Sequence, residues 1–453
     1  MNSRARLPRV LLIAEAANPE LVSVPLEGWS HSRAIARIVN AHMVTQVRNR
    51  EAILRSGLSE SEFTSIDSEA VARPLWRLSE LLRGGAGKGW TLVTAMQSLT
   101  YRYTERLIWK QFRERILARE FDLVHRLTPL SPTIPSSIAA HCARAKVPFV
   151  LGPLNGGVPW PREFDAARRR EREWLSYVRS AHKLVPGYQS TRRHASALIV
   201  GSRDTFAQMP ARHREKCVYI PENAVDPERF PDTPLAAREI PAVPLRIAFV
   251  GRLVPYKGAD MLMDAAAPLI RAGKVIVDII GDGPEMGRLR EIAEREALGA
   301  GVIFAGWIDH RQLQARLQAS HVFGFPSIRE FGGAVVLEAM MLGLVPVVMD
   351  YGGPGELVTP STGFTVPMGP RASIVNAFRE VLGALAAEPE RLGPMSRAAR
   401  QRVRSSFTWD AKARQVLEVY RWVLGEREKP DFGMPLGDPA PASERPAVAV
   451  DTQ

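Results

Sequence analysis

Residues Phe323 to Glu356 read FGFPSIREFGGAVVLEAMMLGLVPVVMDYGGPGE, and this stretch decides the fold of the chain. Its pattern predicts a strand, a loop with Glu330, a helix that opens at Gly332-Gly333 and ends near Gly343, and a second strand from Leu344 to Met349. A helix between two buried apolar strands is typical of a parallel sheet. Because ligands bind beyond the carboxyl ends of such strands, Glu330 and the two glycines are expected to face a ligand.

The start of this helix has the features of a phosphate-binding site. Gly332 and Gly333 let a ligand approach the backbone, and N–H groups at the positive end of a helix suit a phosphate. Glu330 precedes the helix, whereas Glu338 lies about a turn and a half inside it, where its carboxylate can accept from ribose or sugar hydroxyls. The alternative is a solvated Glu338 beside an ordinary turn, but an unpaired carboxylate within the apolar run VVLEAMM would be costly.

The motif EFGGAVVLE resembles the signature of family 4 of the retaining glycosyltransferases, two glutamates separated by seven residues. That family has the two-domain GT-B fold. The resemblance implies that Glu330 meets the donor sugar as a catalytic residue, that Gly332 and Gly333 hold the diphosphate, and that Glu338 holds the nucleotide ribose. The usual order is glutamate, Gly, Phe, Gly, whereas here Phe331 precedes both glycines. This difference leaves the carboxylate spacing unchanged and shifts the backbone contact to the phosphate by one residue.

Two cations in a second loop support this interpretation. Arg252 and Lys257 stand in GRLVPYKG, between a predicted strand from Leu245 to Val250 and a predicted helix from Ala259 to Ala272. Both can converge on one diphosphate at a helix start. The pair matches the diphosphate-binding arginine and lysine of the family. Two solvated loop cations are the alternative.

Two further positions follow from the same resemblance, which is specific from about Leu245 to Gly363. Gly281 ends a predicted strand and matches the family's turn on the nucleotide side; the spacing of the neighbouring glycines does not fit a dinucleotide fingerprint. Trp307 follows the predicted strand from Val302 to Ala305, where the family holds the base by backbone groups.

The first half resembles the family more loosely. Gly28, in a predicted loop from Asn18 to Ser30, is the one candidate for the family's phosphate-facing glycine pair. His125 follows a predicted short strand from Phe121 to Val124, and at a strand end it could bind the donor sugar or stabilise developing charge. The family often has a histidine near this point, and a structural role for His125 is the alternative.

The connector PENAVDPERF, from Pro221 to Phe230, resembles the family's Pro-Asn-Gly-Val-Asp segment between the two domains. Glu222 is inserted before the asparagine, and Ala224 replaces the glycine. The Pro-rich and charged stretch from Pro227 to Pro244 is then the predicted interdomain linker.

These observations predict an α/β protein of the GT-B class. We expect two Rossmann-like, doubly wound domains that face a cleft, with a C-terminal helix that crosses back to the first domain. The predicted segments are an acceptor-binding domain (1–235), a nucleotide-sugar-binding domain (236–407), the crossing helix (408–428) and a disordered Pro- and Ala-rich tail (429–453).

The charge of the chain is uneven. Among 453 residues, 60 are Lys or Arg and 48 are Asp or Glu, and residues 1–240 hold 36 basic and 24 acidic side chains. A basic half can attract an anionic membrane surface or an anionic substrate, and we expect no nucleic acid as partner. The predicted helices Tyr101–Arg119 and Arg168–Lys183 fit either a membrane surface or ordinary solvated surfaces.

Cysteine usage and hydropathy predict a cytoplasmic protein. Cys142 and Cys217 are far apart and have no metal-ligand spacing, which favours a reducing compartment. The apolar run from Val10 to Ala14 is interrupted by Glu15, so it is typical of a first strand and not of a signal peptide. No stretch reaches the roughly 18 apolar residues of a membrane span, which leaves peripheral binding at the inner face of a membrane as an open alternative.

Together, the motifs predict a retaining transferase. The expected donor is a UDP- or GDP-sugar, and the expected acceptor is a hydroxyl of a glycan or a lipid-linked glycan in polysaccharide or glycoconjugate synthesis. No paired-aspartate motif for a metal is present, so we expect neither a metal nor a cofactor. The alternatives are a nucleotide-sugar epimerase or hydrolase on a similar fold, and a catalytically inactive protein that binds a nucleotide and a membrane.

Overall fold

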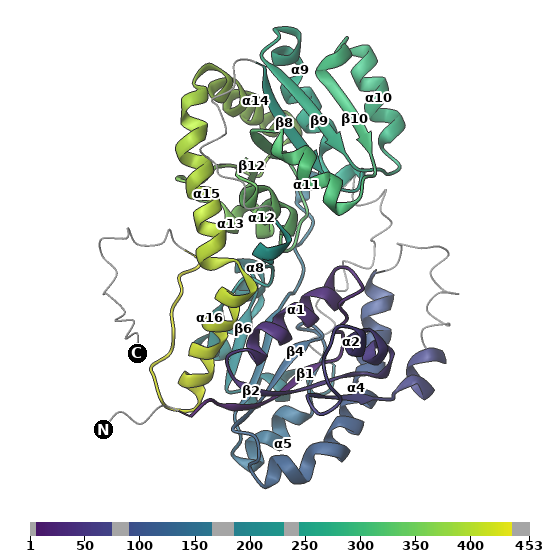
Figure 1. Ribbon diagram of the computed structural model, residues 1–453, viewed down its shortest axis with the longest axis vertical. Helices are drawn as coiled ribbons and strands as arrows, with labels where there is room; N and C mark the ends of the chain where they lie inside the picture. The colour runs from purple at the N-terminus through teal and green to yellow at the C-terminus, as the bar shows by residue number, and fades with distance from the viewer. Residues whose placement is uncertain (1–5, 75–89, 165–184, 231–243, 437–453) are drawn as a thin grey trace.

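The computed structural model describes residues 6–74, 90–164, 185–230 and 244–436. It shows two α/β domains, one above the other along the longest axis of the molecule (Figure 1). Each domain is built on one parallel sheet, and this confirms the predicted GT-B class. The predicted helix at 168–183 and the tail from 437 lie outside the described residues, as does most of the predicted linker.

The N-terminal domain has a seven-stranded sheet in the order β3-β2-β1-β4-β5-β6-β7. Its strands are β1 (Arg9–Ala14), β2 (Asn40–Gln46), β3 (Phe63–Ile66), β4 (Leu123–Thr128), β5 (Phe149–Leu154), β6 (Ala197–Val200) and β7 (Cys217–Tyr219). Its helices include α1 (Val24–Ala36), α2 (Arg50–Arg55), α4 (Trp90–Leu117), α5 (Ile138–Ala145), α7 (Tyr188–His194) and α8 (Arg203–Gln208). The central strands β4 and β5 are buried along their whole length, as expected for a parallel sheet with helices on both faces.

The C-terminal domain has a six-stranded sheet in the order β10-β9-β8-β11-β12-β13. Its strands are β8 (Leu245–Val250), β9 (Val275–Ile280), β10 (Val302–Gly306), β11 (Val322–Phe325), β12 (Val345–Met349) and β13 (Phe364–Val366). Its helices are α9 (Ala259–Arg271), α10 (Met286–Arg295), α11 (His310–Gln318), α12 (Ala334–Met341), α13 (Gly352–Leu357), α14 (Arg371–Ala387) and α15 (Leu392–Ser406). The strand–helix–strand unit predicted between Phe323 and Met349 is therefore β11, α12 and β12.

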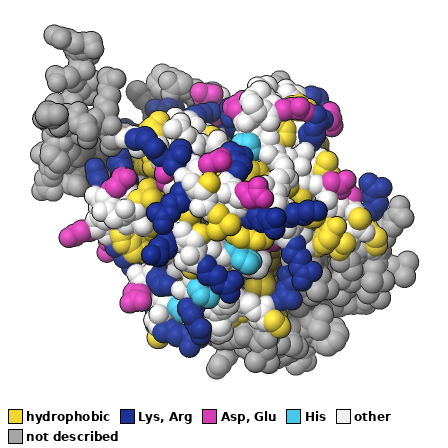
Figure 2. All heavy atoms as spheres, turned by 90° about the horizontal axis from the view of Figure 1, so that it is seen from below, with side chains coloured by type: hydrophobic (Ala, Val, Ile, Leu, Met, Phe, Trp, Pro, Cys, Tyr) yellow, Lys and Arg dark blue, Asp and Glu magenta, His cyan; other side chains and the backbone are white. Residues whose placement is uncertain are grey.

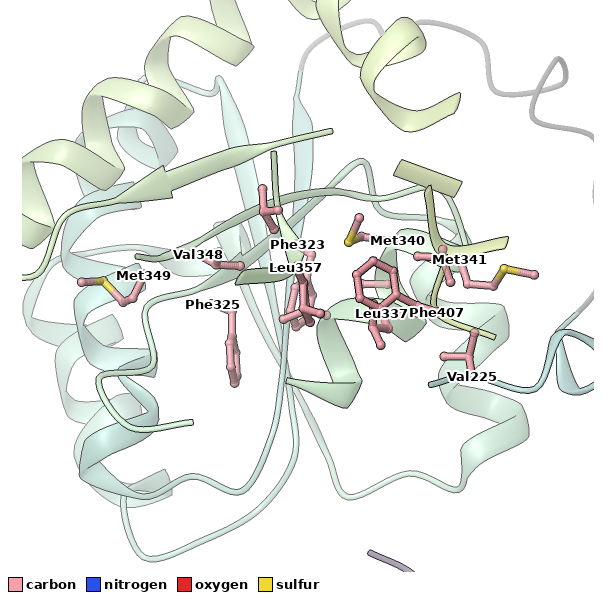
Figure 3. Packing of buried hydrophobic residues seen from close by; sticks show 14 of the residues in the cluster. Val225, Phe323, Phe325, Leu337, Met340, Met341, Val348, Met349, Leu357 and Phe407 are labelled. Atoms are coloured by element: carbon pink, nitrogen blue, oxygen red, sulfur yellow. The ribbon is translucent and has the colours of Figure 1, made fainter. Parts of the chain in front are cut away.

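Helix α12 is apolar on almost every side because it is enclosed by protein. It packs on β12 beneath it and on α15 beside it. Figure 3 shows Leu337, Met340 and Met341 of α12 in one buried cluster with Phe323 of β11 and with Phe407, which follows α15. This packing fixes the position of the glycines at the start of α12.

The chain crosses between the domains twice, and the two crossings lie side by side. Val225 in the connector forms a parallel β-bridge with Thr408. Its N–H donates to the carbonyl of Phe407 at 2.8 Å, and its carbonyl accepts from the N–H of Trp409 at 3.3 Å. The last helix, α16 (Trp409–Val423), then packs against α1 in the core of the N-terminal domain, which confirms the predicted crossing helix (Figure 1).

Two predicted element boundaries in the first half were wrong. Helix α1 begins at Val24 and not near His31, because Pro25 and Glu27 supply the signals of a helix start, so Gly28 lies inside the helix. Strand β4 continues to Thr128, so His125 lies in its interior and not at its end. The sequence pattern suggested a stop at the first polar residue, but the polar residues of β4 are buried as well.

The first part of the predicted tail, residues 429–436, lies within the described residues. After α16 the chain turns back toward α15, and Leu436 is 5% exposed. The guanidinium of Arg402 donates to the carbonyl of Leu436, so the chain at this residue packs on the domain. Among the helices of the described ranges, none combines the length and the apolar character that a membrane-spanning segment needs.

Candidate functional site

The candidate site lies where the C-terminal sheet reverses its strand order. Strand β8 lies beside β11, so the loops that follow these two strands meet at one edge of the sheet. Gly258, with φ of 74°, makes this meeting possible, because a Cβ atom there would lie 2.4 Å from the carbonyl oxygen of Pro326. The close approach brings Lys257 from the first loop to Glu330 in the second, where they form an ion pair.

The Lys257–Glu330 pair is mostly shielded from solvent. The side chains are 17% and 19% exposed. The ammonium of Lys257 also lies over the ring of Phe325, 5.2 Å from its centroid. A lysine ammonium has three N–H donors, so Lys257 can bind the carboxylate of Glu330 and a ligand oxygen at the same time.

The glycines predicted to open α12 do so. Gly333 has φ of 67° and caps the helix, which begins at Ala334. A Cβ atom on Gly332 would lie 1.6 Å from Nδ2 of Asn223, so the helix start touches the connector of the N-terminal domain. A side chain at 332 would therefore have to displace Asn223, so glycine lets the two domains approach closely here.

Glu338 lies on the partly exposed stripe of α12. It is half-buried, as is Ala334 one turn before it, whereas Leu337 and Ala339 are fully buried. The stripe continues to the first turn of the helix. The carboxylate of Glu338 thus lies on the face of α12 that is also partly exposed in the first turn. A nucleotide with its diphosphate at the helix start could reach this carboxylate with its ribose, as predicted for Glu338.

The three other predicted positions of this domain follow neighbouring strands at the same edge. Arg252 is exposed in the loop after β8. Gly281 follows β9, and its N–H donates to the carbonyl of Gly306 at 2.9 Å. Trp307 follows β10, and its side chain is 77% exposed. The structure therefore brings the predicted residues of the C-terminal domain to one edge of the sheet.

His125 is placed differently. It is fully buried, its Nδ1 lies 2.6 Å from the hydroxyl of Tyr420, and its Nε2 lies 2.7 Å from the carbonyl oxygen of Gly152. The carbonyl can only accept, so Nε2 carries the proton and Nδ1 accepts from the tyrosine. Burial lowers the pKa of His125 to about 4, which favours this neutral form. Both ring nitrogens are occupied within the fold, and these contacts tie β4 to β5 and α16.

Gly28 has a packing role in the described structure. It is buried within α1, and a Cβ atom there would lie 2.0 Å from the carbonyl oxygen of Ala16. The glycine lets the helix approach the loop after β1. Gly28 therefore lies in a helix and not in the loop where it was predicted.

A contact between the domains through Glu356 was not predicted. This carboxylate is 2% exposed and accepts from the hydroxyl of Tyr219 at 2.6 Å and from the N–H of Arg203 at 2.9 and 3.1 Å. Arg203 also pairs with Asp350 at 3.0 Å. Tyr219 and Arg203 belong to the N-terminal domain, so Glu356 ties β7 and the start of α8 to α13. The sequence signal for this contact was a glutamate in a Gly-rich turn after a buried strand.

Helix α13 also supports the loop that carries Glu330. A Cβ atom on Gly352 would lie 2.2 Å from the carbonyl oxygen of Glu330, and one on Gly353 would lie 2.1 Å from that of Phe331. The glycine pair therefore lets α13 pack directly on the backbone of this loop. Glu356, at the end of the same helix, connects this packing to the N-terminal domain.

No cluster of three or more His, Cys, Asp or Glu side chains suitable for a metal ion occurs within the described ranges. Cys142 and Cys217 are buried, free thiols, and burial raises the pKa of both.

The match to a known family lies in the second domain. The family model described as "Glycosyl transferases group 1" matches residues 236–401. A glycogen synthase of Mycobacterium tuberculosis (strain ATCC 25618 / H37Rv) is 31% identical over 224 residues, which are 48% of this chain and 52% of the relative. A GDP-mannose-dependent monoacylated alpha-(1-6)-phosphatidylinositol monomannoside mannosyltransferase of Corynebacterium glutamicum is 28% identical over 245 residues, 50% of this chain and 58% of the relative. The chain thus spans about half the length of these curated relatives.

Solved structures match over almost the whole chain. A sucrose-phosphate synthase from Thermosynechococcus elongatus has a TM-score of 0.59 at 16% identity, and the match covers 93% of this chain and 100% of that one. A glycosyltransferase from Rickettsia africae has a TM-score of 0.56 at 14% identity with the same coverage. Such low identities establish the fold alone. Residues 236–401 are therefore similar to the group 1 glycosyltransferases, and the chain as a whole has the GT-B fold.

Proposed function

We propose that this protein is a retaining, metal-independent glycosyltransferase. It moves a sugar from a nucleoside diphosphate sugar to a hydroxyl of a glycan or lipid-linked acceptor in polysaccharide or glycoconjugate synthesis. The observation that carries the proposal is the shielded Lys257–Glu330 pair at the strand-order reversal, beside the glycine start of α12. A cation, a carboxylate and a helix start at one point suit a sugar joined to a diphosphate.

In the proposed reaction the bond between the anomeric carbon and the diphosphate oxygen breaks. The acceptor oxygen bonds to the same face of that carbon, and its proton passes to the departing diphosphate. Negative charge builds on the diphosphate, and Lys257, Arg252 and the first turn of α12 offset it. Glu330 positions the sugar through its hydroxyls, and Glu338 accepts from the ribose.

UDP- and GDP-sugars are the first donors to test. The protein HepE of Anabaena was solved with UDP and with UDP-glucose, and these structures match the chain with TM-scores of 0.56 and 0.52 at 16% and 15% identity. The mannosyltransferase of Corynebacterium glutamicum is GDP-mannose-dependent by name. The first similarity supports uracil and the second supports guanine as the base of the donor. UDP-sugars and GDP-sugars therefore both belong in the donor screen.

A cytoplasmic location with peripheral binding to the inner face of a membrane is part of the proposal. Figure 2 shows the lower face of the molecule, with many Lys and Arg side chains and fewer Asp and Glu side chains among them. Such a face suits anionic lipids and a lipid-linked acceptor. Co-sedimentation with anionic vesicles, but not with neutral ones, is the expected result.

Thermal unfolding in EDTA with UDP, GDP and ADP in turn tests the donor site. A nucleotide at about 100 times its dissociation constant raises the free energy of unfolding by roughly 2.7 kcal/mol. We expect one nucleotide to raise the melting temperature, and Glu338→Ala to weaken this effect by removing the ribose contact. Glu291→Ala, at an exposed position of α10, is the control and should leave the shift unchanged.

Product analysis with the matching nucleotide-sugar then separates the alternatives. A transferase consumes the donor fast only when an acceptor is present, and the anomeric configuration is retained in the product. Conversion of the donor alone at full rate would indicate an epimerase or hydrolase. Binding of a nucleotide without turnover of any donor and acceptor pair would indicate an inactive binding protein.

A further inference from the structure

A second site is suggested by a hollow in the N-terminal domain that the donor site does not use. It is open to solvent on one side, has room inside for about one water molecule or hydroxyl group, and is lined by residues that include Glu27, His31, Thr128, Glu222 and Trp409. These come from α1, the end of β4, the connector and the start of α16. The hollow lies where β1 meets β4, the point at which the strand order of the seven-stranded sheet reverses.

Two polar atoms on the lining residues have no hydrogen-bond partner among the described residues. Glu222 is 7% exposed; its Oε1 accepts from Nδ2 of Asn155 at 2.5 Å, but its Oε2 is buried and unpaired. His31 is 4% exposed, and its Nε2 is buried and unpaired. Buried polar groups in folded proteins are nearly always hydrogen-bonded, so these atoms indicate a missing polar partner.

The charges around the hollow favour a neutral partner. Burial raises the pKa of Glu222 well above its usual value, and the carboxylates of Glu27 and Glu330 raise it further, opposed by Lys412. Burial also raises the pKa of Glu27 to about 7 and lowers that of His31 to about 3. An anionic group placed here would meet two carboxyl groups and a neutral imidazole. A hydroxyl group can donate to one unpaired atom and accept from another in either protonation state of Glu222.

The hollow adjoins the donor site. Oε1 of Glu222 lies only 2.9 Å from the position that a Cβ atom on Gly332 would occupy, at the start of α12. The next residue, Asn223, touches the same glycine. A group bound at Glu222 therefore lies beside the helix start that is proposed to hold the donor diphosphate.

We propose that Glu222 and His31 bind a hydroxyl group of a neutral sugar or polyol acceptor in this hollow. The inference rests on the proposed glycosyltransferase function and names the chemistry of its acceptor next to the transferred sugar. It assigns a role to the glutamate inserted before Asn223 in the connector. It also places any anionic or lipid part of the acceptor outside the hollow.

Direct binding of neutral probes tests the site without any turnover. Methyl glucoside, methyl mannoside and myo-inositol are titrated into the full chain in the presence of the nucleotide that shifts its melting temperature, or of UDP if none does. Glucuronate is the anionic counterpart. We expect one neutral probe to bind and Glu222→Ala to weaken it about tenfold to a hundredfold, as for loss of a buried hydrogen bond.

Glu228→Ala, at an exposed position of the same connector, is the matched control and should leave probe binding unchanged. Glu222→Gln keeps the side-chain volume and carries the test if the alanine variant does not fold. Failure of all neutral probes to bind, equal binding by the Glu222 and Glu228 variants, or tighter binding of glucuronate would each overturn the proposal.

Kinetics separate this inference from the proposed function. With an active donor, Glu222→Ala should raise the KM for the acceptor at least tenfold and change the KM for the donor less than twofold. An unchanged acceptor KM in an active enzyme refutes the acceptor site and leaves the transferase function intact. Probe binding that depends on Glu222, with no transfer from any donor, refutes the transferase function and retains a sugar-binding site.

Discussion

At the scale of single residues, the candidate site depends on the contact between Lys257 and Glu330. The two residues are far apart in the chain, and they meet because β8 and β11 are neighbours in the sheet. The contact holds the lysine ammonium at the proposed position of the diphosphate. It also holds the carboxylate near the proposed position of the sugar.

Replacing Lys257 should therefore affect catalysis more than stability. We expect Lys257→Ala to lower kcat/KM for the donor by about a hundredfold, because one preorganised charge opposite the departing diphosphate is lost. Steady-state kinetics with the identified donor provide the measurement. Lys274→Ala, at an exposed position of the same domain, should change kcat/KM less than twofold. Equal effects of the two substitutions would contradict the assigned role.

The buried histidines make stability depend on pH. The pKa of His125 falls from the usual 6.5 to about 4, and that of His31 falls to about 3, mainly through burial. Below pH 6.5 the unfolded chain binds protons that the folded chain does not, so stability is complete above this pH and is lost as the pH falls. Each histidine contributes a slope of up to about 1.4 kcal/mol per pH unit.

Urea unfolding of the native protein and of His125→Asn between pH 7 and pH 4 measures this effect. The variant should be less stable at pH 7, because the contacts to Tyr420 and Gly152 are weakened. Its free energy of unfolding should then fall less steeply with decreasing pH. Identical slopes for both proteins would show that His125 titrates normally in the folded chain.

At the scale of elements, α13 couples the donor loop to the N-terminal domain. Its glycines pack on the backbone at Glu330 and Phe331, and its Glu356 binds β7 and the start of α8. Neither contact is visible in the hydrophobic pattern of the helix. The glycine contacts arise because β11 and β12 are neighbours in one sheet, whereas the Glu356 contacts arise because the two domains meet.

Removing this coupling should destabilise the folded protein. Tyr219→Phe deletes only the hydroxyl that donates to Glu356 and should lower the free energy of unfolding by about 1 to 3 kcal/mol, since a buried carboxylate loses a partner. Chemical unfolding of Tyr219→Phe, Glu356→Gln and the double variant measures the coupling. If the effects of the two single substitutions simply add, the contact is not energetically significant.

At the scale of the whole molecule, two adjacent crossings join the domains, the connector at Val225 and the chain at Thr408. A pair of neighbouring strands can serve as a hinge because few dihedral angles need to change. We expect the matching nucleoside diphosphate to bring the domains closer and to lower the radius of gyration in small-angle X-ray scattering. Scattering curves that do not change at saturating nucleotide would argue against closure.

Much of the fold was accessible from the sequence. The buried strand β8 was predicted with its observed ends, Leu245 and Val250, because parallel strands covered on both faces are continuous apolar runs. Polar residues in β4 broke this rule, since their partners Tyr420 and Gly152 come from distant parts of the chain. The start of α1 was missed because its helix-start signals, Pro25 and Glu27, lie in a segment that was predicted to be a loop.

The sequence by itself determined the two parallel sheets, the glycines at the start of α12 and the residues that flank this helix, since these follow from local apolar runs and helix-start chemistry. Only the tertiary structure decided that His125 lies within a strand, that Glu356 binds the other domain and that Glu222 faces a hollow beside Gly332. Local pattern reports which face of an element is buried. The partner of a buried polar atom depends on segments that are distant in the chain and meet only in the folded molecule.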